Sequence, residues 1–165
     1  MALFLNGVFE AVLKEVRLVQ DILPEHIMFL QPHKGEAIAK LREDPPSVDD
    51  PMLLLMSLTD DLPNVCYVAE IVGWDDKRAM APRKWHMISR LIWILQPKEG
   101  GLYNASHAEG KESVNLLHVR RLRKLATRVS VTKLMNVGDG QPLSDGRTTS
   151  GGWIYVKAPS PRGLR

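Results

Sequence analysis

The stretch NVCYVAEIVGWDDK, residues 64–77, predicts a buried β-strand that leaves the protein core at Trp74 and runs into the charged residues 75–78. Alternate residues of an extended chain share a face. One face of this strand would hold Cys66, Val68, Glu70, Val72 and Trp74, and the other would hold Val65, Tyr67, Ala69 and Ile71. Because both faces are mostly apolar, we expect the strand to lie in the centre of a sheet.

The run MLLLMSL, residues 52–58, is the expected partner of this strand. It is apolar throughout and has the length of a strand, and the Asp, Pro and Asn residues of 59–64 are typical of a turn. The two runs therefore predict a wide antiparallel hairpin. We expect the following side chains in the core: Phe29, Leu53, Leu55, Val65, Tyr67, Ile71 and Ile154.

The remaining elements are expected to be short. We predict helices at 8–19, with Asn6 as a candidate cap, and at 35–44; strands at 26–32, 114–125 and 153–156; and a helical turn at 130–138. Residues 82–90 predict a helical turn, whereas 91–97 predict a strand because LQPKEG (95–100) echoes LQPHKG (30–35). The pattern indicates an α+β fold: a small antiparallel, partly closed β-barrel or sheet decorated by helices. We expect residues 1–157 to form one domain and 158–165 a polar tail.

Several classes of protein are disfavoured by the sequence. No apolar run approaches the ~20 residues of a membrane span, and the N-terminal residues lack the positive start of a signal peptide. The single cysteine, Cys66, predicts a buried thiol and a reducing, cytoplasmic setting. The five histidines lack metal-ligand spacing, and the phosphate-loop and nucleophile-elbow motifs are absent. We therefore expect no metal, no cofactor and no membrane partner, and an enzyme is the less favoured class.

The net charge of +3 hides an asymmetry along the chain. Residues 111–165 contain eleven Lys or Arg against three Asp or Glu, whereas residues 1–110 contain eleven against sixteen. The surplus is densest in HVRRLRKLATR (118–128), which carries Arg120, Arg121, Arg123, Lys124 and Arg128. Such a run favours either a solvated face or contact with nucleic-acid phosphates, and favours a membrane surface much less.

Four further residues define a candidate binding surface. Trp74 or Trp85 could stack on a base while Lys77 and Arg78 contact phosphates, although a tryptophan that closes the core is the ordinary alternative. Ser57, at the end of the partner strand, is expected to lie near Trp74 and to hydrogen-bond a base edge. Glu70 interrupts an apolar face, so it either pairs with an arginine or serves as the acid of a ligand pocket.

Residues 56–74, MSLTDDLPNVCYVAEIVGW, resemble a segment of the PUA-like superfamily, particularly of its EVE, ASCH and YTH-type branches. These domains have a strand ending in a small hydroxyl residue, a short turn and a second strand of similar pattern. Residues 119–134, VRRLRKLATRVSVTKL, resemble the basic strand and following segment near the end of such domains. The similar regions, 51–74 and 114–137, cover under a third of the chain. A helix takes the place of the expected opening strand, and the insertions at 33–50 and 98–112 have no counterpart.

The resemblance implies a partly closed barrel that binds RNA or a modified DNA base, often by flipping the base into an aromatic-walled pocket. We therefore expect a nucleic-acid-binding module with RNA or DNA as its partner. Some ASCH-type relatives are small nucleoside-processing hydrolases, so one alternative is a hydrolase that uses Glu70 with a nearby lysine or Ser57. A protein-interaction module or homodimer is the other alternative.

Overall fold

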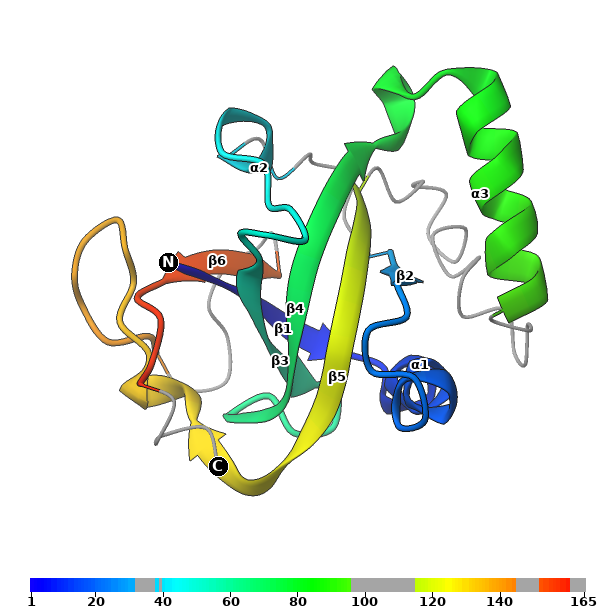
Figure 1. Ribbon diagram of the computed structural model, residues 1–165. Helices are drawn as coiled ribbons and strands as arrows, with labels where there is room; N and C mark the ends of the chain where they lie inside the picture. The colour runs from blue at the N-terminus through cyan, green and yellow to red at the C-terminus, as the bar shows by residue number, and fades with distance from the viewer. Residues whose placement is uncertain (32–37, 39, 96–114, 145–151, 161–165) are drawn as a thin grey trace.

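A computed structural model describes residues 1–31, 38, 40–95, 115–144 and 152–160 of the 165-residue chain. The elements are β1 (Ala2–Val8), α1 (Glu10–Gln20), β2 (Met28–Leu30), α2 (Lys40–Glu43), β3 (Met52–Leu58), β4 (Asn64–Asp76), η1 (Lys77–Ala79), α3 (Pro82–Leu95), β5 (Asn115–Ser130), η3 (Val131–Lys133) and β6 (Trp153–Val156). The strands form one twisted sheet in the order β2-β5-β4-β3-β1-β6 (Figure 1).

The hairpin predicted from residues 52–74 is confirmed. β3 and β4 pair in antiparallel register, with Met56 opposite Tyr67 near the turn and Met52 opposite Ile71 at the far end. β4 lies between β3 and β5, so its predicted central position is also confirmed. The α+β class is confirmed as well, but the sheet is open rather than closed into a barrel, since β2 and β6 lie at its two ends.

The helix predicted at 8–19 is confirmed as α1, but the predicted absence of an opening strand and the cap at Asn6 were wrong. Ala2–Val8 is a strand that pairs in parallel with β3 and antiparallel with β6, so an opening strand is present. Asn6 lies in this strand and does not cap a helix; α1 begins at Glu10, with Phe9 at the N-cap and no side-chain cap. The physical reason is burial: Ala2–Leu5 are buried on both faces of the sheet, which a half-exposed helix would not achieve.

Helix α3 corrects a second prediction. Residues 91–95 continue the helix that begins at Pro82, so the strand predicted for 91–97 is wrong over these residues. Trp85, Ile88, Ile92 and Leu95 keep helical spacing, and this periodicity outweighs the echo of the LQP tripeptide. Residues 96–97 and the second LQP turn lie outside the described residues. The helix predicted at 35–44 is confirmed only as the short α2, and residues 35–37 and 39 of that range are outside the described residues.

The other short elements follow the predictions with shifted ends. β2 and β6 lie within the predicted strands 26–32 and 153–156. β5 extends the predicted strand 114–125 as far as Ser130. The helical turn expected at 130–138 is limited to η3, after which Met135 and Asn136 form isolated bridges to Pro142 and Val156.

The sheet is buried on both sides. Leu13 and Val16 of α1 pack on one face, together with Tyr67 and Ile71 of β4. The opposite face packs around a second cluster formed by Phe4, Leu55, Val65, Leu125 and Val156 with smaller neighbours. Of the predicted core residues, Phe29, Leu55, Val65, Tyr67 and Ile71 are buried, whereas Leu53 and Ile154 are half-buried against the second cluster.

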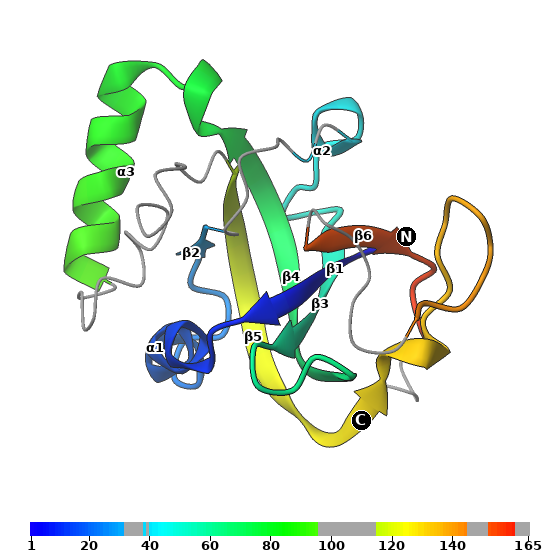
Figure 2. The same cartoon turned by 180° about the vertical axis from the view of Figure 1, so that it is seen from behind.

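Helix α3 stands beside the sheet rather than across it. Figures 1 and 2 show α3 beyond the β2 edge, on the side away from β6 and α2. It is anchored by Ile88, which packs with Phe29 and Leu116, and by the half-buried Trp85. No helix of the described residues is both long and apolar enough to cross a membrane.

Candidate nucleic-acid interface

The basic run of β5 is largely paired with acidic side chains. Arg120 is almost completely buried, and its Nε donates to Glu70 at 2.8 Å while its Nη1 lies 3.2 Å from Glu25. Its remaining nitrogen donates to the carbonyl of Val48 at 3.0 Å. Two carboxylates and a carbonyl thus surround this guanidinium, and it does not face solvent.

Arg121 joins the same two carboxylates. Its backbone has a φ of 53°, a conformation uncommon for a residue with a side chain, at a position where β5 shifts register against β4. Its backbone N–H donates to Pro24, and its guanidinium donates to Glu25 and, at 3.0 Å, to Glu70. The hydrogen bonds that Arg121 donates to these carboxylates, first to Glu25, raise the pKa of Arg121. Arg120, Arg121, Glu25 and Glu70 therefore form a charge-balanced network.

Two further cations of β5 have acidic partners. Lys124 donates to Glu10 at 2.8 Å, and Arg128 lies 2.9 Å from Asp61. The hydrogen bonds from Lys124, Tyr67 and Lys14 lower the pKa of Glu10 to about 2. Arg123 is exposed on the same strand.

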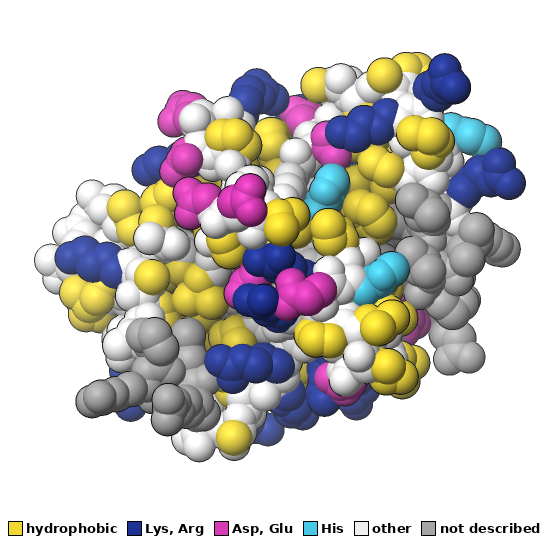
Figure 3. All heavy atoms as spheres, in the orientation of Figure 1, with side chains coloured by type: hydrophobic (Ala, Val, Ile, Leu, Met, Phe, Trp, Pro, Cys, Tyr) yellow, Lys and Arg dark blue, Asp and Glu magenta, His cyan; other side chains and the backbone are white. Residues whose placement is uncertain are grey.

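This pairing explains the charge asymmetry of the sequence. The basic surplus of residues 111–165 meets carboxylates from residues 1–110, which come from α1, from the loop before β2 and from β4. Figure 3 shows Lys and Arg side chains directly beside Asp and Glu near the centre of this face. The run therefore forms a mixed-charge surface, which attracts polyanions much less than its sequence indicates.

Glu70 pairs with arginines, which is the first of the two alternatives that the sequence left open. Both of its oxygens accept hydrogen bonds from guanidinium groups, Oε2 from Arg120 and Oε1 from Arg121. Both oxygens of this carboxylate are thus engaged in charge-assisted hydrogen bonds within the protein. The arrangement gives no support to acid–base chemistry at Glu70.

Ser57 does not lie near Trp74. The antiparallel hairpin places Ser57 beside the turn and Trp74 at the opposite end of β4, past Ile71 and its partner Met52. The Ser57 side chain is fully buried, and its hydroxyl accepts hydrogen bonds from Asn6 at 3.1 Å and from the Gly7 backbone at 2.9 Å. It anchors β1 to β3, so the predicted proximity was wrong.

Trp74 is half-buried against the main core cluster. Its indole N–H donates to the buried Asn115 side chain at 3.0 Å, and the same Asn115 oxygen accepts from the backbone of Ile38 at 2.9 Å. The guanidinium of Arg42 lies 5.8 Å from the ring centroid, within the range of a cation–π contact. Trp74 thus closes the core and carries a cation on its outer side.

The residues after Trp74 form a compact charged corner. Asp76, almost completely buried, accepts hydrogen bonds from the backbone and guanidinium of Arg78 and from Arg42. The hydrogen bond from the Arg78 side chain is the main cause that lowers the pKa of Asp76. Lys77 donates to Gln31 at 3.0 Å and lies 4.9 Å from the ring centroid of the half-buried Trp85. Lys77, Arg78 and both tryptophans therefore do lie in one region of the molecule.

Helix α3 supplies the cations that the sequence analysis did not single out. Residues 77–95 contain five Lys or Arg and no Asp or Glu. Arg83, His86 and Arg90 are exposed and, at a spacing of three and four residues, share one side of the helix. Within the described part of the chain, Arg83 and Arg90 have no carboxylate partner. The sequence feature that could have identified Arg83 and Arg90 is the absence of Asp and Glu from residues 77–95.

A histidine and a lysine share one carboxylate where α3 meets the sheet. His118 Nε2 lies 3.0 Å from Asp75 Oδ2, and Lys84 Nζ lies 2.6 Å from Asp75 Oδ1. Burial lowers the pKa of His118, and Asp75 opposes this effect. The sequence analysis did not connect Asp75 with His118, which lies 43 residues further along the chain.

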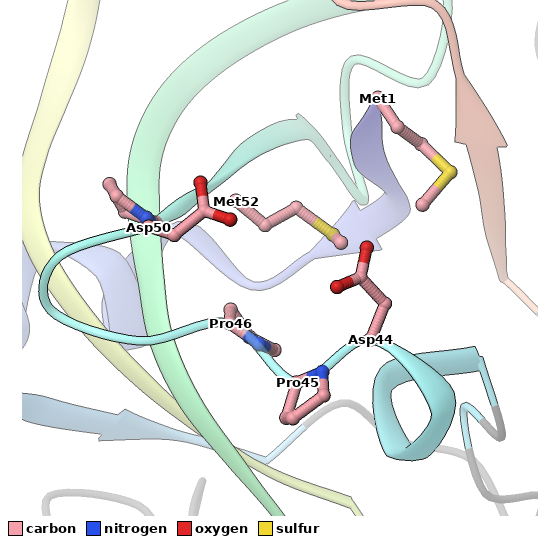
Figure 4. Close-up of a pocket in the computed structure, with 7 residues that line it drawn as sticks. Met1, Asp44, Pro45, Pro46, Asp50 and Met52 are labelled. Carbon is pink, nitrogen blue, oxygen red and sulfur yellow. The ribbon is translucent and has the colours of Figure 1, made fainter.

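A hollow of about 220 Å³ lies elsewhere on the molecule, and none of the predicted site residues lines it. Figure 4 shows the carboxylates of Asp44 and Asp50 directed into the space between Met1, Met52 and Pro46. Two carboxylates disfavour a phosphate ligand. The described residues contain no group of three or more His, Cys, Asp or Glu side chains placed to hold a metal ion.

Cys66 is buried, as predicted, and burial raises the pKa of its thiol to about 11. A thiol of this kind is a poor nucleophile at neutral pH.

No protein-family model, no curated protein and no solved structure matches this chain.

Proposed function

We propose that the protein binds nucleic acid through residues 74–90, with α3 contacting phosphates and Trp74 or Trp85 contributing aromatic surface. The observation that carries the proposal is the pair Arg83 and Arg90 on α3, which are exposed and have no carboxylate partner among the described residues, in contrast to the paired cations of β5. Cations without internal partners are free to replace the counterions of a phosphate backbone. The partner is single-stranded RNA or DNA, because flat aromatic side chains next to cations suit exposed bases.

The position of α3 supports this surface. The helix is attached through one face and stands beside the β2 edge, so its opposite face is open to a long polymer (Figure 1). Arg83 and Arg90 are seven residues apart, which separates them by roughly 10 Å along the helix axis. Figure 3 shows Lys and Arg side chains without neighbouring Asp or Glu at the outer edge of this region.

A relation to PUA-like domains remains part of the proposal. It is supported by the antiparallel pairing of 52–58 with 64–76 and by the opening strand β1, which such domains also have. The open sheet and the two arginines on Glu70 give no support to a closed barrel or to a Glu70-dependent hydrolase.

Fluorescence anisotropy with a labelled single-stranded oligonucleotide, measured as a function of salt, tests the proposal. Arg83→Ala and Arg90→Ala should each reduce the slope of log affinity against log salt by about 0.7, the value for one phosphate contact on a single strand. Arg128→Ala is the matched control, because Arg128 is exposed but paired with Asp61, and it should leave the slope unchanged.

Equal effects of the three substitutions, or the absence of salt-dependent binding, would refute the proposed interface. Light scattering on the same samples tests the homodimer alternative. A stable dimer without nucleic-acid binding would favour the protein-interaction class.

A further inference from the structure

The shared carboxylate of Asp75 links the sheet to the basic helix. Asp75 is the second-last residue of β4, His118 lies on β5 and Lys84 lies in the first turn of α3. The Lys84 side chain is 49% exposed, whereas those of His118 and Asp75 are 23% and 18% exposed. Lys84 can therefore reach a bound polymer, whereas His118 is less exposed and is linked to Lys84 through Asp75.

The imidazole is held in a fixed position. A Cβ at residue 73 would lie 2.8 Å from His118 Nδ1, so only glycine lets the ring lie against β4. On β2, Phe29 meets the ring edge to face, with centroids 5.1 Å apart. His118 Nε2 is thereby kept on Asp75, and a change in its protonation is transmitted to that carboxylate.

We propose that protonation of His118 strengthens nucleic-acid binding at α3 by releasing Lys84 from Asp75, an inference that rests on the function proposed above. With a neutral imidazole, the single charge of Asp75 balances Lys84, and the trio is uncharged. With an imidazolium, Asp75 balances only one of two cations, and the trio carries one positive charge. Lys84, the more exposed cation, is then available to a phosphate.

The groups facing His118 agree with this assignment. Asp75 from β4 and Lys84 from α3 are the charged groups that act on its pKa, and β2 contributes only the uncharged Phe29. On β5 itself, Arg120 is two residues away and is held by Glu70 and Glu25. Because burial lowers the pKa of His118, the imidazole is neutral at pH 7 and the change occurs in acidic solution.

Binding of the labelled oligonucleotide at two pH values tests the inference. The experiment uses protein carrying His86→Gln, so that the exposed histidine on α3 does not contribute to the result. This protein should bind about threefold to tenfold tighter at about pH 5.5 than at about pH 7.5, the effect of one added phosphate contact at low salt. The salt slope should steepen by about 0.7 over the same change.

Adding His118→Gln, which keeps an N–H donor for Asp75 but does not titrate, should abolish both changes. If that variant unfolds, Lys84→Gln provides the same test at an exposed position. A pH effect that persists in His118→Gln or Lys84→Gln overturns the inference, because another group then causes it. Equal binding at both pH values overturns it while leaving the proposed function intact, whereas no binding at either pH overturns both.

Discussion

The strand β5 and the segment 77–95 each carry five Lys or Arg, yet they present different surfaces. On β5, the cations meet Glu10, Glu25, Asp61 and Glu70, which come from distant parts of the chain. Along 77–95, Arg78 and Lys84 have carboxylate partners, whereas Arg83 and Arg90 have none among the described residues and extend into solvent. The number of Lys and Arg residues in a segment therefore indicates less about polyanion binding than whether the fold places carboxylates beside them.

The largest expected difference between the two regions is in stability. Arg120→Ala should lower the free energy of unfolding by about 3 kcal/mol, because it leaves Glu70 in a confined site without its closest cation. Arg83→Ala, at an exposed and unpaired position, should change it by less than about 0.5 kcal/mol. Urea denaturation measures both, and similar values for the two variants would remove the distinction between the regions.

Removing the carboxylates should convert β5 into a surface like α3. The double variant Glu25→Gln and Glu70→Gln frees Arg120 and Arg121 from their acidic partners. One added phosphate contact, from the half-exposed Arg121, should tighten oligonucleotide binding about threefold to tenfold at low salt and steepen the salt slope by about 0.7, whereas Arg120 stays buried. Unchanged binding by a folded double variant would mean that internal pairing is not what prevents β5 from binding phosphates.

The smallest expected effect concerns acid stability. The pKa of Glu10 is lowered from 4.5 to about 2 in the folded protein, chiefly by the hydrogen bond from Lys124. Its contribution is fully present above the unfolded value and is lost as the pH falls from about 4.5 to 2. Glu10→Gln should therefore cost about 1 kcal/mol at neutral pH, a cost that shrinks as the pH falls toward 2 and vanishes below it. Melting curves across this range measure the difference, and a pH-independent loss would assign the effect to packing.

Local patterns were enough to predict the centre of the fold. The alternation in 64–74 and the apolar run at 52–58 correctly indicated a central hairpin, because both signals come from neighbouring residues. The pattern failed for Ala2–Val8, whose strand character depends on the distant partners β3 and β6. It also failed at 91–95, where two local signals disagreed and helical periodicity prevailed.

The candidate site was less predictable for the same reason. Glu70 and Arg120 are 50 residues apart in sequence, and Glu10 and Lys124 are 114 apart, so no local pattern reveals these pairs. Ser57 and Trp74 could have been separated from the sequence alone, because an antiparallel hairpin brings the start of one strand to the end of the other.

The position of β1 has a consequence for how the chain folds. Residues 2–8 are synthesised long before residues 153–156, yet one edge of this strand is paired only when residues 153–156 arrive. Until then the growing chain exposes an apolar strand edge that can pair with other molecules. Contacts between such distant segments also slow folding, since a large loop must close before they form. Completion of the sheet by β6 is thus expected to be a late step, during which an incomplete chain is most prone to aggregate.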